Sequence, residues 1–344
     1  MNRRDLLRYV GDPSQLFGIR DYRMIGSKAD GMRAIDVYTS KGLSFTVMPD
    51  RGMDMANLCY RGTNLSFMSS TGLVGSRYFQ EDGAKGFLKN FNVGFLTTCG
   101  LTYMGAACND NGEELGLHGT ISNTPAYEVS PRVKSTEEAE VICLSGKVRE
   151  ARMFGENLVL TREISCASDG TGFQISDTVE NRGFDITPLM LLYHINFGYP
   201  LLDEGNRLLL PSQKVTPRDA EAEKGLPEYT EISSPVSKYK EQVFVHDMLP
   251  DQEGNVTVGI ANEKLPLMVA ITYKKSQLPY FTQWKSMCEG QYVLGLEPGN
   301  CHVLGRDRAK ADGSLESINP GETKKFEIKV DIIEGLENIK KIFR

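Results

Sequence analysis

The apolar runs of this chain are short, and their length constrains the fold more than any other feature of the sequence. They alternate with polar residues and end at turns, and 34 glycines are spread over the 344 residues. Alternation with a period of two is typical of strands that bury one face, and Asp-Gly content is typical of the turns between them. Helical periodicity is scarce. The sequence therefore predicts an all-β sandwich or barrel rather than alternating β-α units.

The strand pattern is clearest in a series of segments that covers most of the chain. They are residues 43–48, 140–149, 157–166, 173–180, 186–194, 256–262, 267–273, 291–297 and 325–333. Short helices are expected only near the ends, at 3–10 and 334–343.

The same pattern on both sides of every break predicts a single domain over residues 1–344. Residues 1–40 are expected to be an N-terminal extension that packs on it. Residues 213–242 are rich in Glu, Lys, Pro and Ser and lack a strand pattern, so we expect a surface excursion there. No repeat of fixed period is evident.

Charge and cysteine content exclude several classes of protein. The net charge is −6, without a basic stripe to neutralise phosphates, which argues against a nucleic-acid partner. No run approaches the roughly 20 apolar residues of a membrane span, so no membrane partner is expected. Seven irregularly spaced cysteines do not form a disulfide framework. A cytoplasmic protein with free thiols is the expectation.

Two side chains at the ends of apolar runs are the strongest candidates for chemistry. His194 follows Leu189–Tyr193, and its near-neutral pKa suits a general acid, with Asn196 on the same face of the strand. Glu297 ends the run from Tyr292, where burial would raise its pKa toward that of a general base. The structural alternatives are a core histidine bonded to a backbone carbonyl and a glutamate on a solvated turn.

Two glycine-flanked turns carry further polar candidates. His118 stands between Leu117 and Gly119, where a ligand can approach the backbone closely. Arg51 could hold a substrate hydroxyl or carboxylate through its several donors. An Arg51–Asp54 pair that only stabilises the turn is the alternative.

Other chemistries find less support in the sequence. Neither a dinucleotide-binding nor a P-loop glycine motif is present, and no Gly-x-Ser-x-Gly segment occurs. A metal site built from His118, His194 and Glu297 is chemically sound, but no close ligand spacing supports it. We therefore expect no metal and no cofactor.

Five segments together resemble the aldose 1-epimerase (galactose mutarotase) superfamily, and in particular its bacterial branch described as a domain of unknown function. They are Met48–Asp54, Gly94–Thr102, Gly116–Asn123, Tyr193–Pro200 and Leu296–Asn300. The resemblance implies a β-supersandwich of large, mostly antiparallel sheets with few short helices, and a sugar-binding groove on one sheet.

The resemblance also implies roles for three residues. His118 would hydrogen-bond the sugar, His194 would be the general acid and Glu297 the general base. The chain departs from the family pattern at Tyr193, where asparagine is usual, and at Thr120, where a second glycine is usual. No residue matches the family's sugar-binding aspartate unambiguously, and Asp247 is the candidate.

We therefore expect a cofactor-independent isomerase that interconverts the anomers of a free sugar or sugar derivative. The alternatives are a non-catalytic carbohydrate-binding protein on the same fold and a different isomerase of sugars or sugar acids. A carbohydrate is the expected partner, and a homodimer stays open. The expected substrate-binding residues are His118, Arg51, Asp54, Asn196, Asp247, Gln283, Lys285 and Asn300.

Overall fold

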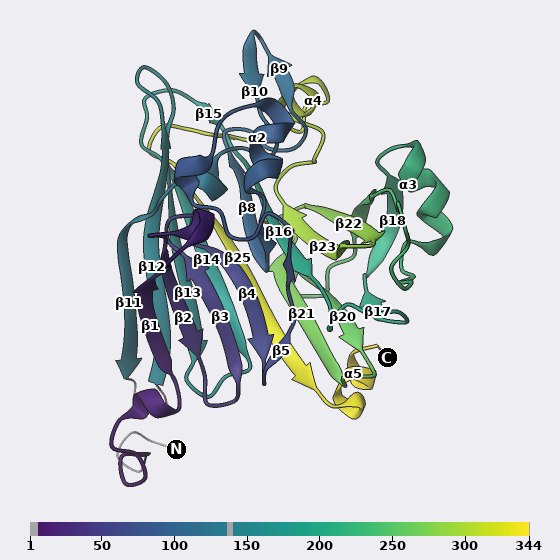
Figure 1. Ribbon diagram of the computed structural model, residues 1–344. Helices are drawn as coiled ribbons and strands as arrows, with labels where there is room; N and C mark the ends of the chain where they lie inside the picture. The colour runs from purple at the N-terminus through teal and green to yellow at the C-terminus, as the bar shows by residue number, and fades with distance from the viewer. Residues whose placement is uncertain (1–5, 136–139, 344) are drawn as a thin grey trace.

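The computed structural model describes residues 6–135 and 140–343, and two large antiparallel sheets dominate this part of the chain (Figure 1). In the larger sheet ten strands follow the order β1 (Gly18–Arg23), β2 (Arg33–Tyr38), β3 (Leu43–Met48), β4 (Asp54–Tyr60), β8 (Leu96–Leu101), β16 (Met190–Phe197), β23 (Gln291–Gly299), β22 (Tyr280–Cys288), β19 (Gln242–Met248) and β18 (Ser212–Pro217). An eleventh strand, β5 (Thr63–Asn64), pairs with β4.

The second sheet has eight strands in the described residues. Their order is β11 (Tyr127–Ser135), β12 (Glu140–Ala151), β13 (Asn157–Ala167), β14 (Gly172–Asn181), β25 (Thr323–Glu334), β21 (Leu267–Lys274), β20 (Asn255–Asn262) and β17 (Arg207–Leu209). Every second residue of β14 and of most of β25 is buried, which is the pattern of a sheet with one wet face.

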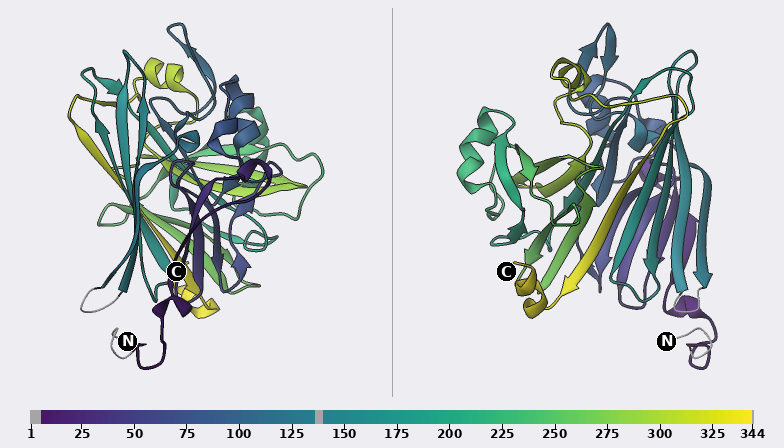
Figure 2. Two further views of the ribbon diagram at one scale, coloured as in Figure 1. Left: turned by 60° about the vertical axis from the view of Figure 1, so that its left-hand side comes forward. Right: turned by 180° about the vertical axis from the view of Figure 1, so that it is seen from behind.

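The two sheets pack face to face and share one hydrophobic core, as the two layers in Figure 2 show. Phe45 from β3 and Phe173 from β14 meet across this interface with ring centroids 4.9 Å apart. All residues of β16 are buried because both of its faces are covered. Tyr193 points into the interface between the sheets, and the next residue, His194, points to the opposite face.

A buried ionic cluster ties the sheets together beneath β16. Arg162 pairs with Asp177 at 2.7 Å and with Asp54 of the other sheet at 3.2 Å. Tyr193 donates a hydrogen bond of 2.7 Å to Asp177. Because each buried charge has a partner, the cluster fixes β4 and β16 on the second sheet without leaving a charge uncompensated.

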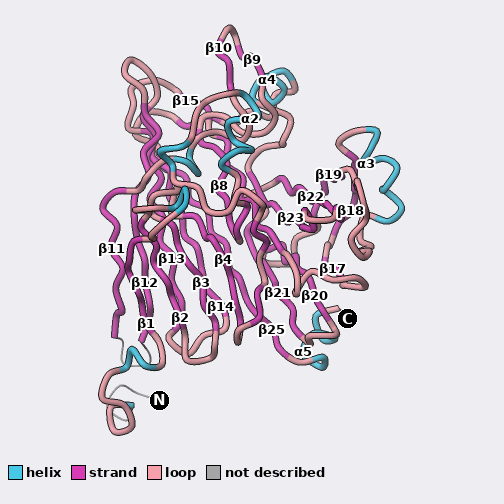
Figure 3. Tube along the Cα trace, in the orientation of Figure 1, coloured by secondary structure: helices cyan, strands magenta, loops and turns pink. Residues whose placement is uncertain are grey.

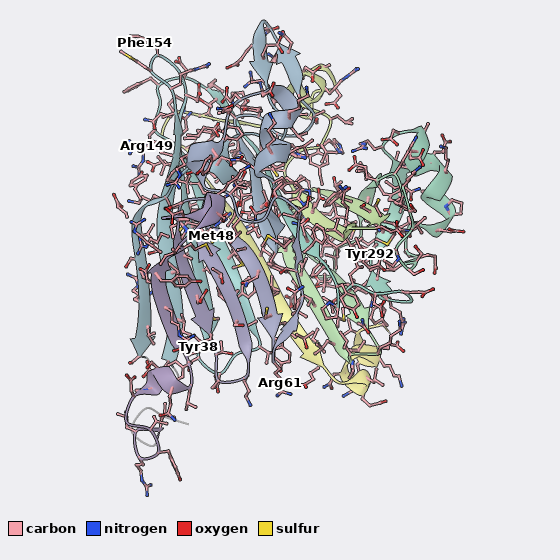
Figure 4. The ribbon with its side chains drawn as sticks, in the orientation of Figure 1. Tyr38, Met48, Arg61, Arg149, Phe154 and Tyr292 are labelled. Atoms are coloured by element: carbon pink, nitrogen blue, oxygen red, sulfur yellow. The ribbon has the colours of Figure 1, made fainter. Side chains whose placement is uncertain are left out.

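Helices are few and short and lie at the margins of the sheets (Figure 3). Helix α2 (Gly83–Asn90), helix α4 (Arg306–Ala311) and the hairpin of β9 (Cys108–Asp110) and β10 (Glu113–Leu115) gather at one end of the molecule (Figure 1). Phe154, in the turn between β12 and β13, also lies at this end, whereas Tyr38 and Arg61 lie toward the other (Figure 4). No described helix is long and apolar enough to cross a bilayer.

The predicted all-β architecture of large antiparallel sheets is confirmed. The strands expected at 43–48, 140–149, 157–166, 173–180, 256–262, 267–273, 291–297 and 325–333 correspond to β3, β12, β13, β14, β20, β21, β23 and β25. The helix expected at 334–343 is α5 (Leu336–Ile342). Part of the helix expected at 3–10 lies outside the described residues.

Three expectations need correction. The strand expected at 186–194 is divided, because β15 (Thr187–Pro188) leaves to pair with β24 (Ser317–Ile318) and β16 starts afterwards. Residues 18–38 are not an extension packed on the domain, since they form β1 and β2 of the larger sheet. The stretch 213–242 contains most of β18 and all of helix α3 (Ala220–Gly225), so it is a structured edge of the sheet.

Candidate functional site

A cavity of about 690 Å³ lies on the face of the larger sheet that is turned away from the second sheet. Strands β16, β19, β22 and β23 form one side of it, and helix α2 with residues from 67–71, 91–93, 106, 117–118, 218, 241 and 303–304 forms the rest. Its polar lining consists of Ser69, Ser70, Thr71, His118, His194, Arg218, Glu241, Thr282, Gln291 and Glu297.

His194 and Glu297 lie side by side in this cavity. The register of β16 and β23 pairs Ile195 with Leu296, which sets His194 opposite Glu297 on the same face of the sheet. Nε2 of His194 is 3.3 Å from Oε1 of Glu297, and both residues are at most 4% exposed. The sequence predicted groups that face each other across the width of a sugar ring. Adjacent strands bring them much closer.

Burial favours the uncharged form of both groups. It lowers the pKa of His194 to about 4, although a hydrogen bond with Asn196 acts in the opposite direction. Burial also raises the pKa of Glu297 well above its usual value, with Glu241 adding to the effect. Burial therefore disfavours the expected pair of imidazolium and carboxylate, because each charge would be desolvated.

Gly295 makes room for the carboxyl group of Glu297. Both residues are on the same face of β23, and a Cβ built at Gly295 would be 2.4 Å from Oε1 of Glu297. A side chain at this position would collide with the carboxyl group in its present place.

His118 enters the cavity from the loop that crosses the end of β8. It adopts a left-handed backbone with φ of 60°, followed by Gly119 with φ of 77°. Its N–H donates to Gly105 and its carbonyl accepts from Gly100, which fixes the turn. The imidazole centroid is 6.0 Å from that of His194. Burial lowers the pKa of His118 to about 3, and within the described residues Nδ1 has no hydrogen-bond partner.

Aromatic side chains surround the two imidazoles. Phe91 and Trp284 each lie with ring centroids 5.2 Å from His194, and Phe87 lies 5.0 Å from His118. Nε1 of Trp284 donates a 2.8 Å hydrogen bond to Glu241, which fixes the indole against the cavity. These apolar faces suit the C–H face of a sugar ring.

Glu241 also forms an ion pair with Arg218. Among the described residues that line the cavity, Arg218 is the one lysine or arginine. Arg218 donates to Glu241 at 3.1 Å and to Asp219 at 2.8 Å. We missed Arg218 and Glu241 in the sequence because the stretch 213–242 shows no strand pattern. Trp284 could have been singled out from the sequence, because it is the chain's one tryptophan.

Two of the expected substrate-binding residues, Gln283 and Lys285, lie on the face of β22 that is turned away from the cavity. The cavity is lined by Thr282 and Trp284, so alternation turns Gln283 and Lys285 to the opposite side. There Gln283 donates to the carbonyl of Tyr229 and Lys285 to that of Glu228, each at 2.8 Å. These bonds anchor the segment that follows α3.

Arg51 and Asp54 also lie outside the cavity. Arg51 is buried in its turn, where Nη1 donates to the carbonyl of Val74 at 2.8 Å, and burial lowers its pKa to about 10. Asp54 accepts from the backbone and hydroxyl groups of Thr98 and pairs with Arg162. Burial raises the pKa of Asp54 to about 6, against the effect of Arg162.

The three remaining expected residues have structural partners. Asp247, the candidate for the sugar-binding aspartate, is exposed and pairs with Lys275 at 2.8 Å. It is not among the residues that line the cavity. Asn300 joins chain segments by accepting from the N–H of Leu191 and donating to the carbonyl of Leu189. Asn196 is buried beside His194, with Oδ1 2.6 Å from Nδ1 of the imidazole.

The described residues, 6–135 and 140–343, contain no cluster of side chains that could bind a metal ion. No group of three His, Cys, Asp or Glu side chains in this part of the chain is close enough to hold an ion. His118, His194 and Glu297, which the sequence brought forward as a candidate ligand set, do not form such a group.

Several solved structures share this fold. A "putative aldose 1-epimerase" from Klebsiella pneumoniae superposes with a TM-score of 0.91 at 24% identity, over 98% of this chain and 88% of that one. A galactose mutarotase-like protein from Clostridium acetobutylicum gives 0.67 at 14% identity, over 93% and 100%. Galactose 1-epimerase from Lactobacillus acidophilus gives 0.58 at 12%, over 93% and 99%.

These likenesses confirm the galactose mutarotase-like fold that the sequence motifs predicted. Comparison with curated proteins gives no match. Residues 29–332 match the model of the family described as "Domain of unknown function (DUF4432)", and the chain therefore belongs to that family.

Proposed function

We propose that this protein interconverts the anomers of a neutral free aldose by proton transfer through His194 and Glu297. The observation that carries the proposal is the adjacent, buried pair itself, with Nε2 and Oε1 3.3 Å apart in a cavity large enough for a sugar. The printed names of the neighbouring structures, aldose 1-epimerase and galactose 1-epimerase, support the same reaction class.

The reaction needs an acid and a base close together. The hydroxyl on the anomeric carbon must lose a proton while the ring oxygen gains one, and the ring then opens to the aldehyde. Both oxygens are bonded to the same carbon, so groups on adjacent strands can reach them from one side of the sugar. Rotation about the bond from the anomeric carbon to its neighbour, followed by the reverse transfers, closes the other anomer. Acid and base groups of this kind contribute about 10²–10⁴-fold each.

The charges around the cavity favour a neutral sugar over a sugar acid. The sugar-acid alternative depended on Arg51, which is buried elsewhere against Val74. Arg218 is engaged by both Asp219 and Glu241, so its charge is already compensated by two carboxylates. A substrate carboxylate would have to compete with these partners and would meet the negative charge of Glu241.

Anomer-exchange NMR on a panel of sugars tests the proposal. Magnetisation exchange between the α and β signals of D-galactose, D-glucose and other neutral aldoses should accelerate in the presence of the protein. The matching uronic acids should respond less, because they add a negative charge. A sugar that binds without any acceleration of exchange would favour the non-catalytic binding protein instead.

A further inference from the structure

Two loops at one end of the second sheet expose large apolar side chains. Met153 and Phe154 lie in the loop between β12 and β13, and Phe184 and Ile186 lie in the loop between β14 and β15. Their exposed fractions range from 66% to 97%. Phe154 lies at the outer edge of the molecule in Figure 4. We call these four residues the loop patch.

The two loops lie side by side, so the four side chains belong to one surface. Leu158 and Asn181 pair across β13 and β14 next to the loops, and the N–H of Arg182 donates to the carbonyl of Asn157 at 2.8 Å. Residues of both loops also line one cavity of about 400 Å³. A contiguous apolar patch on a protein surface is typical of an interaction site.

The backbone of Phe154 gives a second, independent indication. Residues 152–155 form a turn in which the N–H of Gly155 donates to the carbonyl of Arg152 at 3.1 Å. Phe154 is the third residue of this turn and has φ of 62°, a conformation in which glycine or asparagine is usual and a bulky residue is strained. Folding of one chain does not offset this strain, because the ring is almost fully exposed. Burial of the ring against another molecule would offset it.

The arginines beside the loop patch are already paired within the chain. Arg152 pairs with Glu113 at 2.7 Å and with Glu156 at 3.0 Å, and Arg182 pairs with Glu180 at 2.7 Å. A nucleic acid or an anionic lipid surface is bound by Lys and Arg side chains that neutralise phosphates, whereas these arginines face carboxylates. A rim that carries both signs of charge is compatible with an identical rim, as two copies related by a twofold axis require.

The area of the loop patch fits the centre of a dimer interface. An aromatic side chain buries about 150–250 Å², so the two phenylalanine rings account for about 300–500 Å² on each copy. A standard interface buries about 800 Å² on each partner, with an apolar centre and a polar rim. Met153 and Ile186 add to the apolar area, and the paired charges lie at the rim.

We propose that the loop patch is the apolar centre of a twofold interface between two copies of this chain. Phe154 and Phe184 of each copy pack on the same surface of the other copy. None of the four residues lines the cavity that contains His194 and Glu297. The proposal therefore does not depend on the reaction assigned to that cavity.

Sedimentation velocity of the full chain, from nanomolar to high micromolar concentrations, tests the interface. The wild type should have twice the mass of one chain at high concentration and should dissociate on dilution. Phe154→Asn combined with Phe184→Ser should raise the dissociation constant of the dimer at least about a hundredfold. Ile25→Ser is the matched control. Ile25 is 95% exposed and lies between β1 and β2 of the larger sheet, so its substitution should leave the dimer intact.

Several outcomes would overturn the proposal. A wild type that stays monomeric over the whole range would do so, and so would a dimer that the double variant leaves intact. Growth in mass beyond the dimer would contradict a closed twofold interface. A monomer that binds phosphatidylcholine vesicles, with binding lost in the double variant, would assign the loop patch to a lipid surface instead.

Phe154→Asn alone separates association from folding. Asparagine tolerates a positive φ, so in solutions dilute enough to contain only monomers this variant should unfold at the same temperature as the wild type or a higher one. It should nevertheless weaken the dimer at least about tenfold. Hydrogen exchange locates the interface, because the amides of residues 152–156 and 182–186 should exchange more slowly in the dimer and lose this protection on dilution. A dimer that protects other segments and not these two loops would place the interface elsewhere and overturn the proposal.

Discussion

Nε2 of His194 lies 3.3 Å from Oε1 of Glu297, on the neighbouring strands β16 and β23. The distance means that acid and base act as one unit on two oxygens of the same carbon. We expect Glu297→Gln and His194→Gln each to abolish nearly all anomer exchange, at least about 10²-fold, because neither amide can complete the proton transfers. Exchange NMR at saturating sugar gives the comparison.

Asp247→Asn is the matched control for these substitutions. Asp247 is exposed and paired with Lys275 outside the cavity, so this variant should retain the exchange rate of the wild type. Wild-type exchange in either Glu297→Gln or His194→Gln would remove that residue from the reaction.

The same two substitutions should change stability with opposite dependence on pH. The folded pKa of Glu297 is raised above 4.5, so its contribution to folding is complete below pH 4.5 and is lost as the pH rises. Relative to the wild type, Glu297→Gln should therefore become more stable by up to about 1.4 kcal/mol for each pH unit above 4.5. Urea unfolding between pH 4.5 and 7.5 measures the difference.

His194→Gln should give the opposite slope. The folded pKa of His194 is lowered to about 4 from 6.5, so the stability of the wild type rises with pH over that window, and the variant gains relative to it as the pH falls. Parallel slopes for the two variants would contradict the two opposed pKa shifts.

Gly295→Ala should inactivate the site without unfolding the protein. The new Cβ would be 2.4 Å from Oε1 of Glu297, and the carboxyl group is the movable end of that contact. We expect the exchange rate to fall at least about tenfold while the melting temperature changes little, because misplacing a catalytic group is costly. Gly11→Ala, with nothing within 4 Å of its Cβ, is the control. Full activity in Gly295→Ala would show that the carboxyl position is not critical.

The sequence was sufficient for one histidine in a glycine-flanked turn and for two polar residues that end apolar runs. His118, His194 and Glu297 all line the cavity, although they are far apart in the chain. The strands β16 and β23, which hold His194 and Glu297, could be read in part because each is an apolar run that reaches a polar residue, whereas His118 lies in a loop. Gln283 and Lys285 were misplaced because no strand was predicted at 280–288, so nothing indicated which face each side chain would occupy.

Other errors came from contacts that have no local signal. Arg51 is satisfied by the carbonyl of Val74, 23 residues away, and a polar turn gives no hint of that burial. Arg218 and Glu241 lie in a stretch of weak pattern, and only the pairing of β18 and β19 brings them to the cavity. Such long-range partners decide whether a charged residue is structural or functional.

Arg51→Ala should lower stability and leave sugar affinity unchanged. Removing the guanidinium leaves the buried carbonyl of Val74 without this donor, which costs about 1–3 kcal/mol. Thermal unfolding should therefore shift to lower temperature, while the dissociation constant of the sugar stays that of the wild type. Weakened sugar binding with an unchanged melting temperature would show instead that Arg51 contributes to sugar binding.

Sugar binding should change the fluorescence of Trp284. It is the chain's one tryptophan, it lines the cavity, and its ring centroid is 5.2 Å from that of His194. A sugar seated on the catalytic pair would pack against the indole and displace water from it, so neutral aldoses should shift or quench the emission with a saturable dependence on concentration. Glu297→Gln should retain this response, because the amide keeps the shape of the cavity while losing the proton. Free N-acetyltryptophanamide titrated with the same sugars corrects for effects of the solvent. A sugar whose binding is measured by calorimetry but leaves the emission unchanged would show that it binds away from His194, and the cavity would lose its assignment as the sugar site.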